Sequence, residues 1–291
     1  MIRFWIAAIF CCFSLSACST SSQFGPIDPG SSSDTRQVWL VPGSAGAVRA
    51  VVYRPKNTGP SPLAVISHGS SEDEAYRAQM NDPDYPLLAQ WLVSRGFVVV
   101  IPQRPGHGQT GGPYLETAGT CEYPDFKVAG LTSAATLESV IGYMREQPIV
   151  AGGPVLLIGH SAGGWASLAL AGKRPDLARA VVVFAAGRGG RSDNKPNSNC
   201  APDKLISTAA EFGANARAPV IWIYSENDTY FSPAMGRNIA SAYSRGGSQA
   251  TFIVAPTSKE DGHFFVHDAQ AVTVLSAPLT RILKSPSATT H

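Results

Sequence analysis

Short hydrophobic segments rich in β-branched residues recur along most of the chain, separated by stretches whose hydrophobic residues fall on one helical face. Eight of these segments predict β-strands, at residues 37–41, 48–53, 63–67, 97–101, 155–158, 180–184, 220–224 and 251–254. The first two follow each other closely, as in a hairpin, whereas the later ones are almost uninterrupted hydrophobic runs. Such runs are typical of parallel strands that helices cover on both faces.

Four of the intervening stretches predict helices, at residues 85–94, 125–146, 162–173 and 233–243. In the first of them the hydrophobic residues lie on one face, and Gly96 follows where a helix would end. A hairpin followed by β–α–β units predicts an α/β fold with one eight-stranded, mostly parallel, doubly wound sheet and helices on both faces. We expect this domain to span residues 34–284, and the polar residues 285–291 to form a disordered tail.

The first 17 residues have the layout of a secretory signal peptide. They carry one charge, at Arg3, followed by a hydrophobic run over residues 4–13 and then small residues. This run is shorter than the roughly 20 residues that a membrane-spanning helix needs. We therefore expect residues 1–17 to be removed from the mature protein.

The segment Leu15-Ser16-Ala17-Cys18 resembles the lipobox of bacterial lipoproteins. The resemblance implies cleavage before Cys18 and diacylation of its sulfur, with residues 18–33, rich in Ser, Gly and Pro, as a flexible tether. It also implies a cell-envelope location, as a periplasmic lipoprotein held at the outer membrane because Ser19 rather than Asp follows the cysteine. An ordinary signal peptide with an incidental cysteine is the alternative.

Two cysteines, Cys121 and Cys200, remain when residues 1–17 are removed and Cys18 carries lipid. An even pair in an oxidising compartment is expected to form a disulfide. Two separate buried thiols are the alternative, because spacing along the chain does not reveal the distance between the Cα atoms.

Composition narrows the possible functions. The chain has 44% hydrophobic and 15% charged residues, against roughly 25% charged in an average globular chain, which excludes a disordered polyelectrolyte. The formal net charge is +2 without any basic cluster, so we expect no nucleic-acid partner. Six scattered histidines and the lack of a Cys-x-x-Cys sequence predict no metal site.

The sequence Gly159-His160-Ser161-Ala162-Gly163 lies directly after a predicted strand and opens a predicted helix. This is the context of a G-x-S-x-G nucleophile elbow, in which the serine occupies a sharp, strained turn and the glycines let neighbouring chains approach. The N-terminus of the helix also offers N–H groups and partial positive charge to a developing oxyanion. Ser161 is therefore the candidate nucleophile.

A serine hydroxyl needs a histidine base that an acid orients, and in this setting the chain order is serine, acid, histidine. Asp228 follows the strand predicted at residues 220–224, and His263 follows the last predicted strand. Both fall at the strand ends that share an edge with Ser161, where α/β sheets bind ligands. Glu226 is the rival acid and His267 the rival base.

The oxyanion hole is expected to take one donor from the loop after the third predicted strand. There Gly69 lets the backbone turn, so that the N–H of Ser70 faces the site. The hole then consists of the N–H groups of Ser70 and Ala162, with Ser71 as a possible substitute.

Together these motifs resemble the α/β-hydrolase superfamily, on residues 68–69, 104–108, 159–163, 225–228 and 262–263. The lack of a long helical insertion and the Asp-Gly-His-Phe stretch from residue 261 are most similar to the dienelactone-hydrolase-like branch. Dienelactone hydrolases proper carry Cys at the nucleophile position, whereas this chain has Ser161. The resemblance implies an α/β-hydrolase fold.

The resemblance further implies a serine carboxylesterase that hydrolyses small to medium esters through an acyl-enzyme, without a metal or organic cofactor. The expected partner is a small-molecule ester, and membrane contact is expected only through the lipid anchor. A peptidase-like or polyester hydrolase of the same fold, and a non-catalytic envelope lipoprotein, are the alternatives.

Residues 186–202 occupy the position where related hydrolases place a lid. They contain three cationic side chains, Arg188, Arg191 and Lys195. These side chains form either a cationic rim that accepts acidic acyl groups or a solvated loop held by Cys200. Trp165 and Tyr230 are candidates to line the site, with core packing as the alternative for Trp165.

Overall fold

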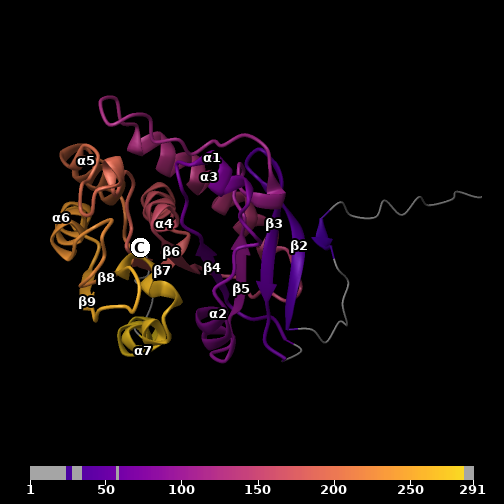
Figure 1. The fold of residues 1–291 in the computed structure, drawn as a ribbon. Helices are drawn as coiled ribbons and strands as arrows, with labels where there is room; N and C mark the ends of the chain where they lie inside the picture. The colour runs from indigo at the N-terminus through magenta and orange to yellow at the C-terminus, as the bar shows by residue number, and fades with distance from the viewer. Residues whose placement is uncertain (1–23, 28–34, 57–58, 285–291) are drawn as a thin grey trace, which may run out of the picture.

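The computed structural model describes residues 24–27, 35–56 and 59–284, in which nine strands form one sheet of order β1-β2-β3-β5-β4-β6-β7-β8-β9 (Figure 1). The strands are β1 (Gly25–Pro26), β2 (Arg36–Gly43), β3 (Gly46–Tyr53), β4 (Leu63–Ser67), β5 (Val98–Pro102), β6 (Val155–His160), β7 (Ala178–Phe184), β8 (Val220–Ser225) and β9 (Ala250–Ala255). The pairs from β1 to β3 and the pair of β3 with β5 are antiparallel, and the remaining pairs are parallel. The predicted mostly parallel sheet with an antiparallel start is confirmed.

The ninth strand is the difference from the eight that the sequence predicts. β1 pairs Gly25 with Leu40 and Pro26 with Trp39, and it lies within residues 18–33, which were predicted as a tether. A two-residue strand without hydrophobic alternation has no signal of its own, and the exposed edge of β2 supplies its partners. Residues 1–17, Cys18 and the tail at 285–291 lie outside the described residues.

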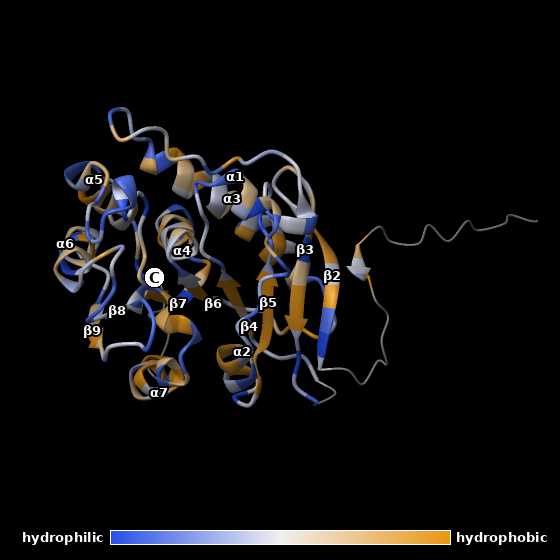
Figure 2. Ribbon diagram, viewed as in Figure 1, coloured by the Kyte–Doolittle hydropathy of each residue, from blue (hydrophilic) through white to orange (hydrophobic). Residues whose placement is uncertain are grey.

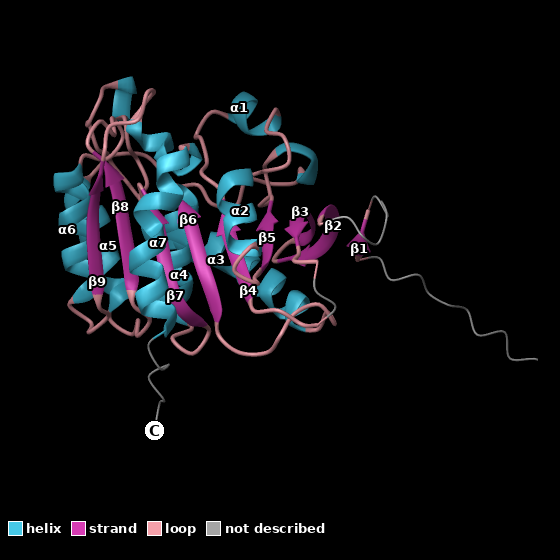
Figure 3. Cartoon of the chain, turned by 90° about the horizontal axis from the view of Figure 1, so that it is seen from below, coloured by secondary structure: helices cyan, strands magenta, loops and turns pink. Residues whose placement is uncertain are grey.

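Helices cover both faces of the sheet (Figure 3). They are α1 (Glu74–Ala78), α2 (Pro86–Val93), α3 (Phe126–Arg145), α4 (Ala162–Lys173), α5 (Pro202–Gly213), α6 (Pro233–Ser244) and α7 (Ala269–Lys284). Side chains of α2 and α7 pack on one face, and those of α3, α4, α5 and α6 pack on the other. The doubly wound arrangement is therefore confirmed. None of the helices in the described residues is long and hydrophobic enough to cross a membrane.

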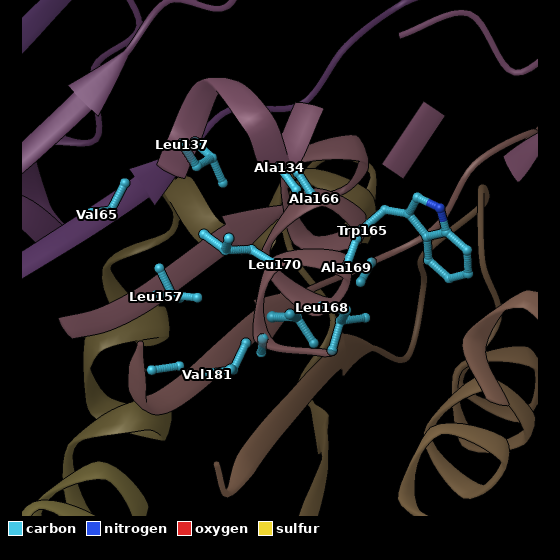
Figure 4. Close-up of a cluster of buried hydrophobic side chains, with 14 of the residues drawn as sticks. Val65, Ala134, Leu137, Leu157, Trp165, Ala166, Leu168, Ala169, Leu170 and Val181 are labelled. Carbon is cyan, nitrogen blue, oxygen red and sulfur yellow. The ribbon is translucent and has the colours of Figure 1, made fainter. Parts of the chain in front are cut away.

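The core follows from the alternation of side chains along each strand, which points successive residues to opposite faces. Val65 and Leu157 face α4, whose Leu170 packs over them (Figure 4), whereas Ile66 and Ile158 belong to the opposite layer. β3, β4 and β5 accordingly consist of hydrophobic residues, drawn in orange, along most of their length (Figure 2). Each fully buried aliphatic side chain of this kind contributes about 1.5–3 kcal/mol.

Trp165 is part of this core. Its side chain is fully buried, its ring lies 5.2 Å from that of Phe212, and its Nε1 donates to the main-chain oxygen of Phe126 at 2.8 Å. Of the two interpretations of Trp165, core packing is correct. A buried indole N–H needs such a partner, which fixes the orientation of the ring.

A disulfide joins Cys121 to Cys200, whose Cα atoms lie 5.0 Å apart. The predicted pair is therefore present in the structure. The disulfide joins the loop before α3 to the segment between β7 and α5. That segment begins at the carboxyl end of β7. The separation of 79 residues means that this bond closes a long loop of the chain.

Candidate active site

Ser161 occupies the turn between β6 and α4 with φ 53° and ψ −119°, and the residue is 8% exposed. A positive φ in a residue other than glycine costs about 1–3 kcal/mol and persists only where the surroundings enforce it. A Cβ at Gly159 would lie 2.3 Å from the oxygen of Gly163, and one at Gly163 would lie 2.1 Å from the oxygen of Ser67. Gly159 is therefore required by the close approach of β6 to α4, and Gly163 by the close approach of α4 to β4.

Asp228 follows β8 and is almost fully buried. Its Oδ1 accepts hydrogen bonds from the N–H groups of Tyr230, at 2.8 Å, and Phe231, at 2.9 Å. Because both donors belong to the loop that carries Asp228, these hydrogen bonds fix the orientation of its carboxylate. Glu226, the rival acid, is exposed to solvent, so the structure brings Asp228 and not Glu226 into the site.

His263 lies in the short 3₁₀ helix Gly262–His267, and its Nδ1 is 3.3 Å from Oδ1 of Asp228. A Cβ at Gly262 would lie 2.7 Å from the nitrogen of Asp228, so only glycine lets the two loops approach this closely. The carboxylate of Asp261 accepts the N–H of His263 at 3.0 Å and begins the 3₁₀ helix. Tyr230 stacks on the imidazole with 4.0 Å between ring centroids. The predicted acid and base are thus adjacent.

His267, the rival base, stacks instead on Tyr85, with 4.8 Å between the ring centroids and 9° between the ring planes. His160, which follows Gly159 in the elbow, has a role that the sequence did not reveal. Its Nε2 donates to the main-chain oxygen of His263 at 2.8 Å. Burial, together with repulsion from His263 and His267, holds the pKa of His160 well below its ordinary value. The neutral ring therefore supports the backbone of His263.

The loop after β4 lies directly against the turn of Ser161. A Cβ at Gly69 would be 3.5 Å from Cβ of Ser161 and 3.0 Å from Nδ1 of His160. The N–H groups of Ser70 and Ala162 donate no hydrogen bond to any partner within the described ranges. The structure thus brings the loop that carries Ser70 next to Ser161.

A buried ionic cluster lies behind this loop. Glu116 accepts two hydrogen bonds from Arg104, at 2.8 and 3.1 Å, one from Ser133 at 2.8 Å and one from Arg188. Arg104 also donates to the main-chain oxygen of His68 at 2.7 Å, which anchors the start of the loop. Burial alone would raise the pKa of Glu116, but the guanidiniums of Arg104 and Arg188 hold it well below its ordinary range.

The interpretation of residues 186–202 as a solvated loop held by Cys200 is confirmed for residues 193–197, which are exposed, and for Cys200, which is disulfide-bonded. Arg188 departs from both interpretations. Its side chain is 3% exposed and donates to Glu116 and, at 3.1 Å, to the hydroxyl of Tyr114. It is neither part of an exposed cationic rim nor solvated, because its charge is matched inside the protein. Arg191 is half-buried and donates to Oγ1 of Thr229 at 3.0 Å, whereas Lys195 is exposed.

The site combines a serine on a strained turn, an imidazole against a buried carboxylate, and two backbone N–H groups that have no partner among the described residues. These are the groups that acyl transfer through a covalent serine ester requires. Within the ranges that the structure describes, no cluster of three or more His, Cys, Asp or Glu residues could hold a metal ion.

Comparisons with known proteins agree with this geometry. A family model described as "Alpha/beta hydrolase family" matches residues 64–284. No curated protein matches the chain.

Solved structures give the same fold. The chain is similar to a putative dienelactone hydrolase from Klebsiella pneumoniae subsp. pneumoniae, with 18% identity, a TM-score of 0.59 and coverage of 84% of this chain and 97% of that chain. Est1E from Butyrivibrio proteoclasticus has 15% identity, a TM-score of 0.56 and coverage of 85% and 99%. The acylaminoacyl peptidase of Pyrococcus horikoshii has 14% identity, a TM-score of 0.62 and coverage of 88% and 43%. At these identities the likeness establishes the fold alone.

Proposed function

Because the chain belongs to the α/β-hydrolase family, we propose that it is a serine carboxylesterase that hydrolyses small to medium esters through an acyl-enzyme on Ser161. The observation that supports this most strongly is the meeting of the imidazole and carboxylate of His263 and Asp228, 3.3 Å apart, at the sheet edge that carries Ser161. The comparisons support hydrolase chemistry of this family in general. The serine mechanism and the ester preference are our proposal.

In the proposed reaction, Oγ of Ser161 attacks the ester carbonyl while Nε2 of His263 takes its proton. Asp228 holds the Nδ1–H of the imidazole and stabilises the imidazolium that forms. The N–H groups of Ser70 and Ala162 stabilise the oxyanion, and the loss of one such donor typically costs about 10²–10³ in kcat.

His263 then returns the proton to the leaving alkoxide, which departs as the alcohol. In the second half of the reaction a water molecule, deprotonated by His263, attacks the acyl-enzyme and releases the acid. The proton passes back to Ser161, so the enzyme is regenerated. No metal or organic cofactor takes part in these steps.

The test is a panel of p-nitrophenyl esters from acetate to laurate with the chain from Ser19 onward. Ser161→Ala, His263→Ala and Asp228→Asn should each lose about 10³-fold or more in kcat/KM, and the exposed Glu226→Gln should match the wild type. A wild type no faster than Ser161→Ala on every ester would refute the esterase. Faster turnover of peptide amides or polyesters than of these esters would favour the alternative hydrolases.

We also propose that the chain is a lipoprotein of the cell envelope, anchored through Cys18. The support is the lipobox-like sequence and its position after a hydrophobic run. In a bacterial host, Cys18→Ser should move the protein from the membrane fraction to the soluble fraction. An unmodified Cys18 in the mass spectrum of the mature wild type would refute the anchor.

A further inference from the structure

The hydroxyl of Ser70, whose N–H we assign to the oxyanion hole, points back into the protein. Its Oγ lies 2.9 Å from Nε2 of His107 and 3.3 Å from the hydroxyl of Tyr114. A longer contact of 3.4 Å reaches the main-chain oxygen of Ser71. The short contact to His107 is the strongest of the three, so this imidazole is the main anchor of the Ser70 side chain.

The contacts of the other ring nitrogen of His107, Nδ1, decide which group donates in the hydrogen bond between Ser70 and His107. Nδ1 of His107 lies 3.1 Å from the main-chain oxygens of both Arg104 and Pro105. A carbonyl oxygen can only accept, so Nδ1 carries the proton. Burial and the charge of Arg104 lower the pKa of His107 to about 4, although Glu116 acts in the opposite direction. The neutral ring therefore accepts at Nε2, and Ser70 donates.

The other contacts fit this direction. Because the hydrogen of Ser70 is directed to His107, its oxygen is free to accept from the hydroxyl of Tyr114. Tyr114 in turn accepts from a terminal nitrogen of Arg188 at 3.1 Å, and the guanidinium of Arg77 lies 3.7 Å over its ring. The chain of donors thus runs from the buried ionic cluster through Tyr114 and Ser70 to His107.

We propose that His107 is a positioning residue for the oxyanion hole, because it holds the hydroxyl of Ser70 so that the Ser70 N–H faces the carbonyl oxygen of the substrate. The proposal rests on the proposed function. It also implies that the Ser70 hydroxyl is not itself an oxyanion donor, since its hydrogen is used inside the protein. A donor that is out of place by about 1 Å can lower the rate roughly 10²-fold.

Ser70, His107 and Glu116 have the composition of a second serine–histidine–acid set, and Nδ1 of His107 lies 3.8 Å from Glu116. Their hydrogen bonding argues against nucleophilic chemistry. The Nδ1 proton is directed to carbonyl oxygens, and the carboxylate is occupied by two guanidiniums. Ser70 therefore has no base that an acid orients, in contrast to Ser161.

The experiment compares Ser70→Ala, His107→Leu and the double variant in the full chain, with p-nitrophenyl butyrate as substrate. Each single variant should lose about 10- to 100-fold in kcat with KM within about threefold. The double variant should be no slower than the slower single variant, because both changes break the same hydrogen bond. His107→Gln, whose amide oxygen can accept from Ser70, should recover part of the rate.

Two further readouts separate positioning from simple destabilisation. The affinity of an alkyl boronic acid, which forms a tetrahedral adduct with the serine, should fall in parallel with kcat in both single variants. Ser139 is partly buried, and its hydroxyl donates to the main-chain oxygen of Ala135 in the same helix at 3.1 Å, so Ser139→Ala should match the wild type in both readouts. Ser70→Ala removes a single oxygen, so it tests the proposal even if His107→Leu does not fold.

Several results would overturn the proposal. These are kcat within twofold of the wild type in Ser70→Ala, losses that multiply in the double variant, or fluorophosphonate labelling of Ser70 in the Ser161→Ala protein. A wild type that neither turns over esters nor reacts with a fluorophosphonate would overturn the proposed function and this role with it. A reactive wild type with unaffected variants would overturn the role of His107 alone.

Discussion

Glu116→Gln is expected to destabilise the protein strongly without touching Ser161. The carboxylate is buried between two guanidiniums and accepts hydrogen bonds from Arg104, Arg188 and Ser133. Glutamine keeps the shape but removes the charge, and its amide nitrogen would face donors. Two cations would then remain buried against a single neutral oxygen.

The cost follows from the burial of these groups. Arg104 and Arg188 are 1% and 4% exposed, so neither can recover its hydration in the folded state. Removing one partner from a buried, hydrogen-bonded charge pair costs about 3–5 kcal/mol. Because a domain of this kind has a stability of about 5–15 kcal/mol, Glu116→Gln should lower the urea midpoint by a large fraction of its value.

The pH dependence gives a second signature. The folded pKa of Glu116 lies below the value of about 4.3 for an unfolded glutamate. The contribution of the Glu116 carboxylate to the free energy of unfolding is therefore fully present above the unfolded pKa. It is lost as the pH falls toward the folded pKa. The difference in unfolding free energy between wild type and Glu116→Gln should be constant from pH 7 to pH 5 and should narrow below about pH 4.

The assay is urea unfolding followed by circular dichroism at several pH values, with Glu226→Gln as the matched control at an exposed site. The control should stay within about 0.5 kcal/mol of the wild type. A loss below 1 kcal/mol in Glu116→Gln, or a difference that does not change between pH 7 and pH 3, would refute this account of the cluster.

Three further outcomes are expected. Gly163→Ala should lower the free energy of unfolding in urea by about 1–3 kcal/mol or more, because the added Cβ would lie 2.1 Å from a backbone oxygen. Gly152→Ala is the control and should be close to neutral, because its Cβ would meet nothing within 4 Å. Equal losses in the two variants would contradict this. Reduction of the bond between Cys121 and Cys200 should cost about 2–4 kcal/mol in the same assay, because it opens a long loop, and an unchanged midpoint would contradict it. His160→Phe should lower kcat roughly tenfold in steady-state kinetics because the carbonyl of the proposed base loses its donor, and unchanged kinetics would show that this hydrogen bond is dispensable.

The sheet and the three candidate catalytic residues could be predicted because their signals are local. A buried parallel strand is a continuous hydrophobic run, and the loops that follow such strands meet at one edge. Ser161 and Asp228 each follow a buried strand of that kind, and His263 follows the edge strand β9. Their order along the chain was therefore enough to predict that all three belong to one edge of the sheet. The two-residue strand β1 has no such run and depends on the edge of β2.

The surroundings of the oxyanion loop could not be predicted, because the partners are far apart in the sequence. Arg188 is 72 residues from Glu116, and its loop is otherwise polar, so the sequence favoured an exposed side chain. His107 and Ser70 are 37 residues apart, and neither lies in a periodic segment. Whether a buried polar residue is satisfied depends on such long-range pairs, which spacing along the chain does not encode.

The central claim, that Ser161 is the nucleophile, is tested most directly by trapping the covalent enzyme. The protein is incubated with a fluorophosphonate, its intact mass is measured, and the modified peptide is identified by mass spectrometry. We expect one equivalent of phosphonyl group on Ser161, no incorporation in Ser161→Ala, and slower labelling in His263→Ala. A folded wild type that stays unlabelled, or that carries the label on another residue, would contradict the account.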